Sequence, residues 1–173
     1  FYSIGYMRCN NEHEHTGYFA AFAFCMSSVM GFAMASYLLT FFFFYELLTI
    51  ASYPLVLHKR NEEALLASRK YLIYTLISGQ LFLAGLVAVY CISGTLDFKA
   101  GGFLTTDMAP TWQLQLIFLI MILAGSVKAA VMPLHGWLPA AMIAPTPVSA
   151  LLHAVAVVKT GAFAVLRIIG FVF

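Results

Sequence analysis

Long apolar runs alternate with short charged segments along this chain, and the lengths of these runs predict helices that cross a membrane. Residues 16–57 carry a single charged side chain, that of Glu46. A helix needs about 20 apolar residues to cross the hydrocarbon core of a bilayer. We therefore expect two consecutive spans at 17–35 and 38–57, joined by a tight turn near Ala35.

Three further spans follow from the same pattern. The charged segment 58–70 precedes a third span at 71–93, whose helix can begin earlier because residues 62–70 are good helix formers. A loop at 94–110 follows, then a fourth span, and a fifth at 147–170. The pattern predicts an all-α fold, an integral membrane helical bundle of about five transmembrane helices.

The fourth span, which starts near Thr111, cannot continue as a regular helix. Two prolines and a glycine interrupt it: Pro133, Gly136 and Pro139. Irregular backbone within a bilayer is tolerated only where it is buried in protein or lines a watery cavity, and broken helices mark transport sites in several carriers. Beyond the break, Thr146 is expected to cap the fifth helix, with Pro147 at its first helical position.

The orientation of the bundle follows from the Lys and Arg residues in its short loops. Four of them lie in 58–70, whereas 94–110 contains only Lys99. We therefore expect the 58–70 loop on the cytoplasmic side. Five spans then place residues 1–16 on the same side and the C-terminal end on the other.

Composition agrees with a membrane protein. The chain is 62% hydrophobic and 9% charged, whereas about 25% of the residues in a typical soluble domain are charged. A net charge of +2 gives no reason to expect a nucleic-acid partner. Three cysteines lack metal or disulfide spacing, and no glycine-rich nucleotide loop is present, so we expect no cofactor. The Glu-His-Glu-His run at 12–15 is more typical of a solvated linker than of a metal site.

Lys128 is the most informative candidate for chemistry, because no charged residue lies between it and Asp107 or Lys159. A charge at bilayer depth costs about 2.5–3.5 kcal/mol on insertion scales. Glu46 is its natural partner, since a nearby carboxylate favours the protonated amine and its withdrawal favours the neutral one. A Glu46–Lys128 pair whose separation changes is a proton switch, whereas a fixed pair would only set helix register.

Further polar groups extend this candidate path. Thr49 and Tyr53 share a helix face with Glu46, although Glu46 could also be a structural carboxylate bonded to a neighbouring helix. If the helix continued for two turns past Lys128, His135 would lie about 20° from the same face; otherwise it is a loop or interface histidine. The third span carries a weak polar stripe that core packing explains equally well: Tyr71, Thr75 and Ser78.

The fifth span adds two titratable groups. His153 shares a regular-helix face with Ser149 and Thr160, and histidine can relay protons near neutral pH. Lys159, six residues on, lies about 120° around the helix, so a relay between the two needs water, a long side chain or a local bulge. Both could instead be structural, held by hydrogen bonds or by a carboxylate. Arg167, near the end of the span, is expected to snorkel to the interface.

The stretch from Lys128 to Gly161, with its Ala-Pro-Thr-Pro-Val-Ser-Ala-Leu-Leu-His sequence, resembles the proton-conducting antiporter-like family. That family includes the large membrane-arm subunits of respiratory complex I, related hydrogenase subunits, and the A and D subunits of Mrp-type cation/proton antiporters. The sequence from Tyr45 to Tyr53 is similar to the family's fifth-helix motif, where Trp or Phe often precedes the glutamate. The opening Tyr-Ser-Ile-Gly-Tyr-Met resembles the loop before the fourth helix.

This resemblance implies that the five spans correspond to helices four to eight of a subunit with roughly fourteen helices. Residues 1–173 would then form a single, partial transmembrane domain, the first of two inverted half-channels. By motif, Glu46 resembles the fifth-helix glutamate and Lys128 the lysine of the broken seventh helix. His153 and Lys159 fall on relay positions of the eighth helix. A start at Phe1 and an end within an apolar run also suggest part of a longer protein.

The implied function is proton translocation as an antiporter-like subunit of a multisubunit Na⁺ (cation)/H⁺ antiporter. Two alternatives remain open. One is a proton-pumping membrane-arm subunit of NADH:quinone oxidoreductase or of a related hydrogenase, and the other is a structural scaffold without flux of its own. The implied partners are other membrane subunits, the lipid bilayer, protons and, for an antiporter, Na⁺. The expected location is the cell inner (plasma) membrane.

Overall fold

The computed structural model describes residues 2–10, 15–105 and 107–173. Five helical segments in these ranges are long and apolar enough to cross a membrane: α2 (His15–Met34), α3 (Leu38–Val56), α4 (Glu62–Ser93), α5 (Thr111–Lys128) and the segment Thr146–Phe171. This confirms the predicted all-α bundle of five spans. A short helix that the polar N-terminal sequence did not predict, α1 (Tyr2–Cys9), precedes them.

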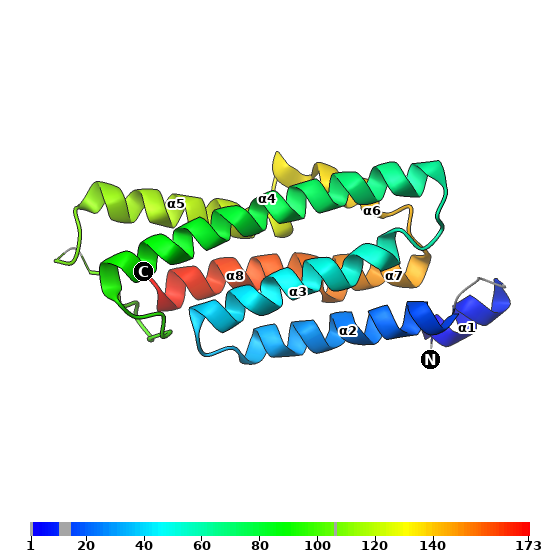
Figure 1. The fold of residues 1–173 in the computed structure, drawn as a ribbon, viewed down its shortest axis with the longest axis horizontal. Helices are drawn as coiled ribbons and strands as arrows, with labels where there is room; N and C mark the ends of the chain where they lie inside the picture. The colour runs from blue at the N-terminus through cyan, green and yellow to red at the C-terminus, as the bar shows by residue number, and fades with distance from the viewer. Residues whose placement is uncertain (1, 11–14, 106) are drawn as a thin grey trace.

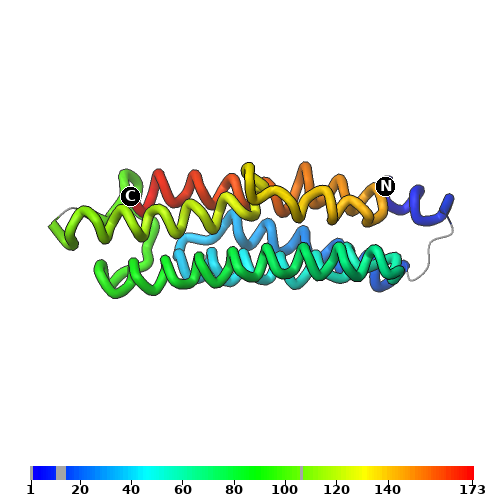
Figure 2. The backbone as a smooth tube through the Cα atoms, turned by 90° about the horizontal axis from the view of Figure 1, so that it is seen from above, coloured from blue at the N-terminus to red at the C-terminus, as the bar shows by residue number. Residues whose placement is uncertain are grey.

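The spans form two layers. Helices α2, α3 and α4 pack side by side in chain order, and α5 packs on α4 (Figure 1). The last helix, α8 (Val157–Phe171), packs on α5, and these two form the second layer (Figure 2). The N-terminus and the α3–α4 connection lie at one end of the bundle, while the C-terminus and the α4–α5 loop lie at the other (Figure 1).

Helix α4 has clear signals at both ends. The side-chain oxygen of its N-cap, Asn61, accepts a hydrogen bond from the backbone N–H of Ala64 at 3.0 Å. Two glutamates in the first turn suit the positive end of the helix dipole. At the other end Gly94 adopts the left-handed conformation with φ of +67°, which glycine permits. The expectation that residues 62–70 extend this helix is confirmed.

Two apolar clusters fill the bundle, and polar side chains lie between them. One cluster contains Phe41 and Phe82, and the other contains Tyr71 and Trp137. Along α4, the fully buried polar residues Thr75 and Ser78 lie between Tyr71 of one cluster and Phe82 of the other. The middle of the bundle, where a membrane protein has the least access to water, therefore contains a band of hydroxyl groups.

The fourth span is broken as predicted. Helix α5 ends at Lys128, and Ala130 adopts a left-handed conformation with φ of +55°. A short 3₁₀ turn, η1 (Leu134–Gly136), and a short helix, α6 (Trp137–Ala141), then carry the chain back over α4. Since residues 133 and 139 are prolines without a backbone N–H, this segment cannot extend α5 as one regular helix.

The fifth span differs from the regular helix expected at 147–170. It consists of α7 (Thr146–Ala150), a π-helical turn η2 (Leu151–Val155), and α8. The backbone N–H of Ala156 bonds to the carbonyl oxygen of Leu151 at 2.7 Å, and this five-residue spacing widens the helix.

The predicted cap of this span is displaced by one residue. Pro145 occupies the N-cap position, Thr146 is the first helical residue, and no side chain caps the helix. The Thr146 hydroxyl instead donates to the hydroxyl of Tyr6 on α1 at 3.4 Å. The side chain therefore links the start of this span to α1 rather than satisfying the backbone of its own helix.

Arg167 ties the end of α8 to two loops. Its guanidinium carbon lies 4.9 Å from the ring centre of Phe98 and 4.8 Å from that of Phe171. Its Nη2 atom donates to the carbonyl oxygen of Ala35 at 3.4 Å. Arg167 is thus held by aromatic faces and by the α2–α3 turn, more tightly than a residue that only snorkels to the interface.

Candidate functional site

Lys128 is fully buried at the end of α5. Its Nζ atom donates a hydrogen bond to the backbone carbonyl oxygen of Tyr45 and lies 3.4 Å from the centre of the Tyr45 ring. A carbonyl oxygen has two lone pairs, so it can accept this bond while remaining part of α3. A desolvated cation over an aromatic face is stabilised by about 2 kcal/mol. Lys128 therefore joins the broken end of α5 to the middle of α3.

Tyr45 is itself fixed by contacts to two other helices, α4 and α5. Its hydroxyl donates to the carbonyl oxygen of Ala124 on α5 at 3.1 Å and lies 2.8 Å from Ser78 Oγ on α4. Ser78 Oγ also donates to the Ala124 carbonyl oxygen at 2.8 Å. The Tyr45 ring stacks on Phe82, with the ring centres 5.2 Å apart and the planes at 25°. The ring beneath Lys128 therefore has little freedom to turn.

Glu46 is half-buried, and its charge interacts electrostatically with that of Lys128. Its carboxylate lies against Gly79 of α4, since a Cβ atom at Gly79 would collide with it. Within the described ranges, Glu46 Oε1 is buried without a hydrogen-bond partner. Glu46 thus lies within electrostatic range of Lys128, but the hydrogen bond of Lys128 goes to the carbonyl oxygen of Tyr45.

Three more buried hydroxyls have no hydrogen-bond partner in the described part of the chain: those of Tyr18, Thr49 and Thr160. An unsatisfied buried polar group costs about 1–3 kcal/mol. Thr49 belongs to the polar stripe predicted beside Glu46 and is fully buried, whereas Tyr53 of the same stripe is half-buried. Thr49, three residues after Glu46 on α3, therefore adds a buried hydroxyl near Glu46 that is not hydrogen-bonded to another described protein group.

His135 lies away from this pair. It is exposed on η1, and α5 does not persist past Lys128, so the face shared by His135 and Lys128 in a continuous helix does not form. The left-handed conformation of Ala130 turns the chain at this point. Trp137, two residues on, points inward and donates from Nε1 to the carbonyl oxygen of Val127 at 2.8 Å.

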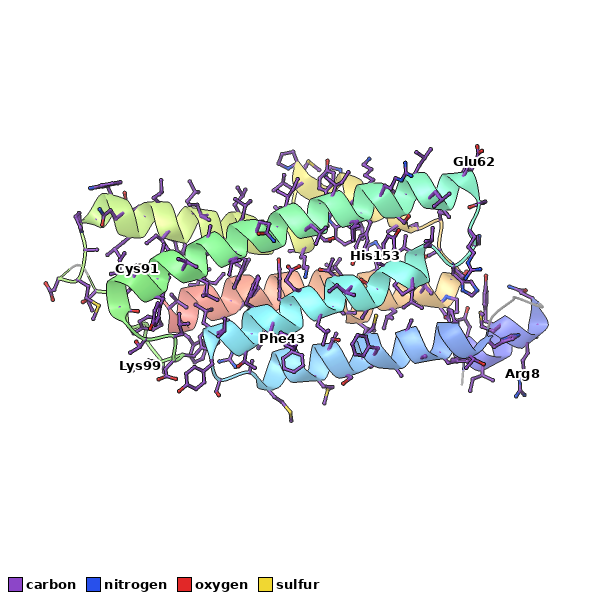
Figure 3. All side chains as sticks on the ribbon, in the orientation of Figure 1. Arg8, Phe43, Glu62, Cys91, Lys99 and His153 are labelled. Carbon is purple, nitrogen blue, oxygen red and sulfur yellow. The ribbon has the colours of Figure 1, made fainter. Side chains whose placement is uncertain are left out.

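His153 and Lys159 are both exposed on the surface of this chain. Figure 3 places His153 along the length of the bundle, between the ends marked by Arg8 and Lys99. His153 lies in the π-helical turn, whereas Thr160 is only 2% exposed. The face predicted for His153 and Thr160 in a regular helix is therefore wrong, because the π turn changes the rotation between them. Among the described residues, no hydrogen bond joins the exposed side chains of His153 and Lys159 to the buried Lys128.

The site contains buried residues beyond those that the sequence predicts. Ser52 Oγ lies 2.6 Å from the Tyr71 hydroxyl, which places α3 and α4 in contact through buried oxygens. The stripe of Tyr71, Thr75 and Ser78 was visible in the sequence, and all three are fully buried. The sequence carries no signal for Gly79, and the signal for Tyr45 is its position next to Glu46.

The described residues contain no group of three or more His, Cys, Asp or Glu side chains placed to hold a metal ion. Residues 12–14 of the Glu-His-Glu-His run lie outside the described part of the chain. The three cysteines are free thiols: Cys9, Cys25 and Cys91. The buried titratable groups of the described site are Lys128 and Glu46, which carries a buried Oε1 atom, and buried hydroxyls lie on the same helices.

Known proteins are similar to this chain in sequence. Residues 35–173 match the family model described as NADH:quinone oxidoreductase/Mrp antiporter, TM. The chain is 32% identical to the chloroplastic NAD(P)H-quinone oxidoreductase subunit 5 of Symphyotrichum cordifolium, over 97% of this chain and 23% of that protein. It is 28% identical to the D-type subunit of the Na(+)/H(+) antiporter of Bacillus subtilis (strain 168), over 100% of this chain and 34% of that protein.

Solved structures share the fold. A chain of the membrane-bound sulfane sulfur reductase, an archaeal respiratory membrane complex, matches with a TM-score of 0.78 and 30% identity, over 86% of this chain and 30% of that one. A chain of the Mrp complex from Dietzia sp. DQ12-45-1b matches with a TM-score of 0.73 and 25% identity, over 84% and 27%. This chain spans 23–34% of the length of these four proteins. It belongs to the NADH:quinone oxidoreductase/Mrp antiporter transmembrane family.

Proposed function

We propose that this chain moves protons across a membrane as an antiporter-like subunit of a multisubunit Na⁺ (cation)/H⁺ antiporter. One observation carries the proposal: Lys128 is fully buried where a membrane helix breaks, and it interacts with Glu46 while hydrogen-bonded to Tyr45. A buried intramembrane cation that has two alternative partners can change its protonation when it changes partner. The likeness to the D-type subunit of the Bacillus subtilis Na(+)/H(+) antiporter supports the antiporter assignment.

In the proposed path, protons enter near His153 or Lys159, with His135 beside the break, and reach Lys128. They move on when the Glu46–Lys128 pair opens or closes. The unpartnered hydroxyl of Thr160, on the same span as His153, supports a route between the surface and the pair. Because the relatives are longer than this chain, we propose that other segments or partner subunits cover the exposed entry residues.

Inverted membrane vesicles that contain the full-length chain with its partner subunits provide the test. A pH-sensitive dye would report proton movement when Na⁺ is added, in wild type and in Lys128→Ala. We expect Na⁺-evoked proton movement to be lost in Lys128→Ala and kept in Lys99→Ala, which removes an exposed lysine from a loop. Equal flux in wild type and an assembled Lys128→Ala complex would overturn the proposal.

The second candidate function is that of a proton-pumping membrane-arm subunit of NADH:quinone oxidoreductase or of a related hydrogenase. It is favoured by 32% identity to an NAD(P)H-quinone oxidoreductase subunit 5 over 97% of this chain. The same vesicles separate the two functions, since NADH would then drive proton uptake and Na⁺ would not. With either driving force, loss of the dye-reported proton movement in Lys128→Ala would support a place for Lys128 in the proton path.

A structural scaffold is the competing explanation for the buried charges. In that case the Glu46–Lys128 pair only locks α3 to α5 and transport lies in partner subunits. The scaffold predicts that Glu46→Gln and Lys128→Ala lower the thermal unfolding midpoint of the complex, while the surviving complexes transport normally. The proton-path proposal predicts loss of flux in complexes that remain assembled.

We propose further that the protein lies in the plasma membrane with residues 58–70 on the cytoplasmic side. The larger number of Lys and Arg residues in this segment, which covers the α3–α4 connection and the first turns of α4, than in 94–110 supports it. Single cysteines at Lys59 and Lys99, in a chain without its three native cysteines, would be tested with a membrane-impermeant maleimide. In intact cells only the cysteine at position 99 should react, and labelling at position 59 instead would reverse the orientation.

A further inference from the structure

We infer that Tyr45 is a positioning residue. Its ring and its carbonyl oxygen form a binding site for the Lys128 ammonium, the Tyr45 site, which holds the ammonium apart from the Glu46 carboxylate on the same helix. The transport consequence of this inference rests on the proposed function. The position of Lys128 in the presence or absence of the Tyr45 ring can be determined independently of the proposed function.

The Tyr45 site provides two interactions from one residue. The carbonyl oxygen accepts a hydrogen bond from Lys128 Nζ, and the ring face lies 3.4 Å from the same atom. Both residues are fully buried, so water does not compete for the ammonium. The Tyr45 site stabilises a cation through the carbonyl dipole and the ring quadrupole, and it contains no negative charge. It can therefore hold Lys128 while leaving Glu46 free to accept a proton or a hydrogen bond.

Glu46 points to a different neighbour. Successive side chains on an α-helix are about 100° apart, so Tyr45 and Glu46 cannot face the same point. The Glu46 carboxylate lies against Gly79 of α4, where a side chain would collide with it, and its Oε1 atom is buried without a partner in the described ranges. The carboxylate therefore retains an unused acceptor for the ammonium.

The Tyr45 ring cannot follow Lys128 if the ammonium moves toward Glu46. Its hydroxyl donates to the carbonyl oxygen of Ala124, one turn before Lys128 on α5, and the ring stacks on Phe82 of α4. Tyr45 thus contacts α5 both at Ala124 and at Lys128. With the helices held together in this way, the switch requires a movement of the lysine side chain and not a separation of α3 from α5.

The competing explanation is that Tyr45 is only one of several packed aromatic rings. Phe41 provides the matched control, because it lies one turn earlier on α3, is fully buried, and belongs to the same apolar cluster. Its ring centre lies 6.1 Å from that of Phe82, and it makes no cation–π contact with Lys128 among the described residues. Tyr45→Phe keeps the ring, whereas Tyr45→Leu and Tyr45→Met remove it.

The first readout is a high-resolution structure of the full-length complex. In Tyr45→Leu, or in Tyr45→Met if the leucine variant does not assemble, we expect Lys128 Nζ to pair with the Glu46 carboxylate. In Tyr45→Phe we expect Nζ to remain over the ring. The inference is overturned if Nζ stays on the carbonyl oxygen of residue 45 without the ring, or leaves it in Tyr45→Phe.

The second readout is proton flux in the vesicles described above. We expect Tyr45→Leu to lower flux by about tenfold and Phe41→Leu to stay within about twofold of wild type. Tyr45→Phe, which keeps the ring but loses the bond to Ala124, should lower flux less than Tyr45→Leu. If Phe41→Leu lowered the proton flux as much as Tyr45→Leu, the effect of Tyr45 would be explained by packing alone, and the inference would be wrong. If Lys128→Ala retains full flux, the proposed function fails, while the structural readout still decides where Lys128 is held.

Discussion

The indole nitrogen of Trp137 donates a hydrogen bond of 2.8 Å to the carbonyl oxygen of Val127, the residue directly before Lys128. The backbone N–H of Ala130 bonds to the same oxygen at 3.1 Å. Trp137 is fully buried, and its ring lies 5.4 Å from that of Tyr71 on α4. This bond returns the chain after the break to the end of α5 and fixes the backbone that carries Lys128.

Trp137→Phe should therefore lower the free energy of unfolding of the full-length protein by about 1–3 kcal/mol, through loss of a buried hydrogen bond and of ring volume. Thermal unfolding in detergent would measure the change. Trp112 supplies the control, since it is 62% exposed and Trp112→Phe should stay within about 0.5 kcal/mol of wild type. If the two substitutions lowered the free energy of unfolding equally, the hydrogen bond from Trp137 to Val127 would not contribute to stability as proposed.

Gly161 permits close contact between α8 and the end of α5. A Cβ atom at Gly161 would collide with the backbone of Lys128 and Ala129, and a helix backbone cannot move aside as a flexible side chain can. Gly161→Ala should thus destabilise the protein by about 1–3 kcal/mol, measured as a lower denaturation midpoint.

The matched control for this substitution is Gly170→Ala, on the same helix but with open space around the added methyl group. It should be neutral or raise stability by up to about 1 kcal/mol, because alanine favours helix. A Gly161→Ala protein as stable as Gly170→Ala would show that α5 and α8 can separate at no measurable cost.

Gly79→Ala tests the position of the Glu46 carboxylate. The added methyl group would collide with that carboxylate and should displace it from α4. If Glu46 is in the proton path, flux in vesicles should fall about tenfold, as in Glu46→Gln. Gly17→Ala, which meets no neighbouring atom, should leave flux unchanged, and wild-type flux in Gly79→Ala would show that this position of Glu46 is not required.

Asn61→Ala should loosen the start of α4. The substitution removes the bond from the Ala64 N–H to the Asn61 side chain, which is worth about 1 kcal/mol at an N-cap. Hydrogen–deuterium exchange of the first-turn amides should become faster, whereas Lys59→Ala, at an exposed position just before the cap, should not change it. Unaltered exchange in Asn61→Ala would indicate that the two first-turn glutamates suffice.

The span boundaries could be predicted because the bilayer imposes a length. The sequence predicts the second span at 38–57, and α3 runs over Leu38–Val56. The break after Lys128 was equally predictable, since proline removes backbone donors whatever the surrounding packing. These features depend on local sequence and on the thickness of the membrane, and they need no knowledge of which helices touch.

The contact of Lys128 with the Tyr45 site could not be predicted in the same way. Its hydroxyl bonds to the carbonyl oxygen of Ala124, a residue 79 positions later in the chain. Nothing in a run of phenylalanines before Tyr45 indicates which ring will face a lysine. The contact depends on how α3 and α5 are rotated against each other, and that rotation is set by packing, including the glycine contact between α5 and α8.

The π-helical turn escaped prediction for a related reason. Residues 151–156 are apolar or small except for His153, a composition that suits a regular helix equally well. The assumption of a regular helix then placed His153 and Thr160 on one face, whereas one is exposed and the other is buried. A single wide turn was enough to make that part of the site prediction wrong.

The bond from the Ala156 N–H to the Leu151 carbonyl oxygen closes a turn that contains one residue more than an α-helical turn. Removing one residue from this segment would therefore restore an ordinary turn and leave the flanking helices α7 and α8 facing the same neighbours. Removing one residue from the middle of α8 would instead rotate everything beyond it by about 100°. Of the whole fifth span, the segment that carries His153 is the one that can change length without moving the rest.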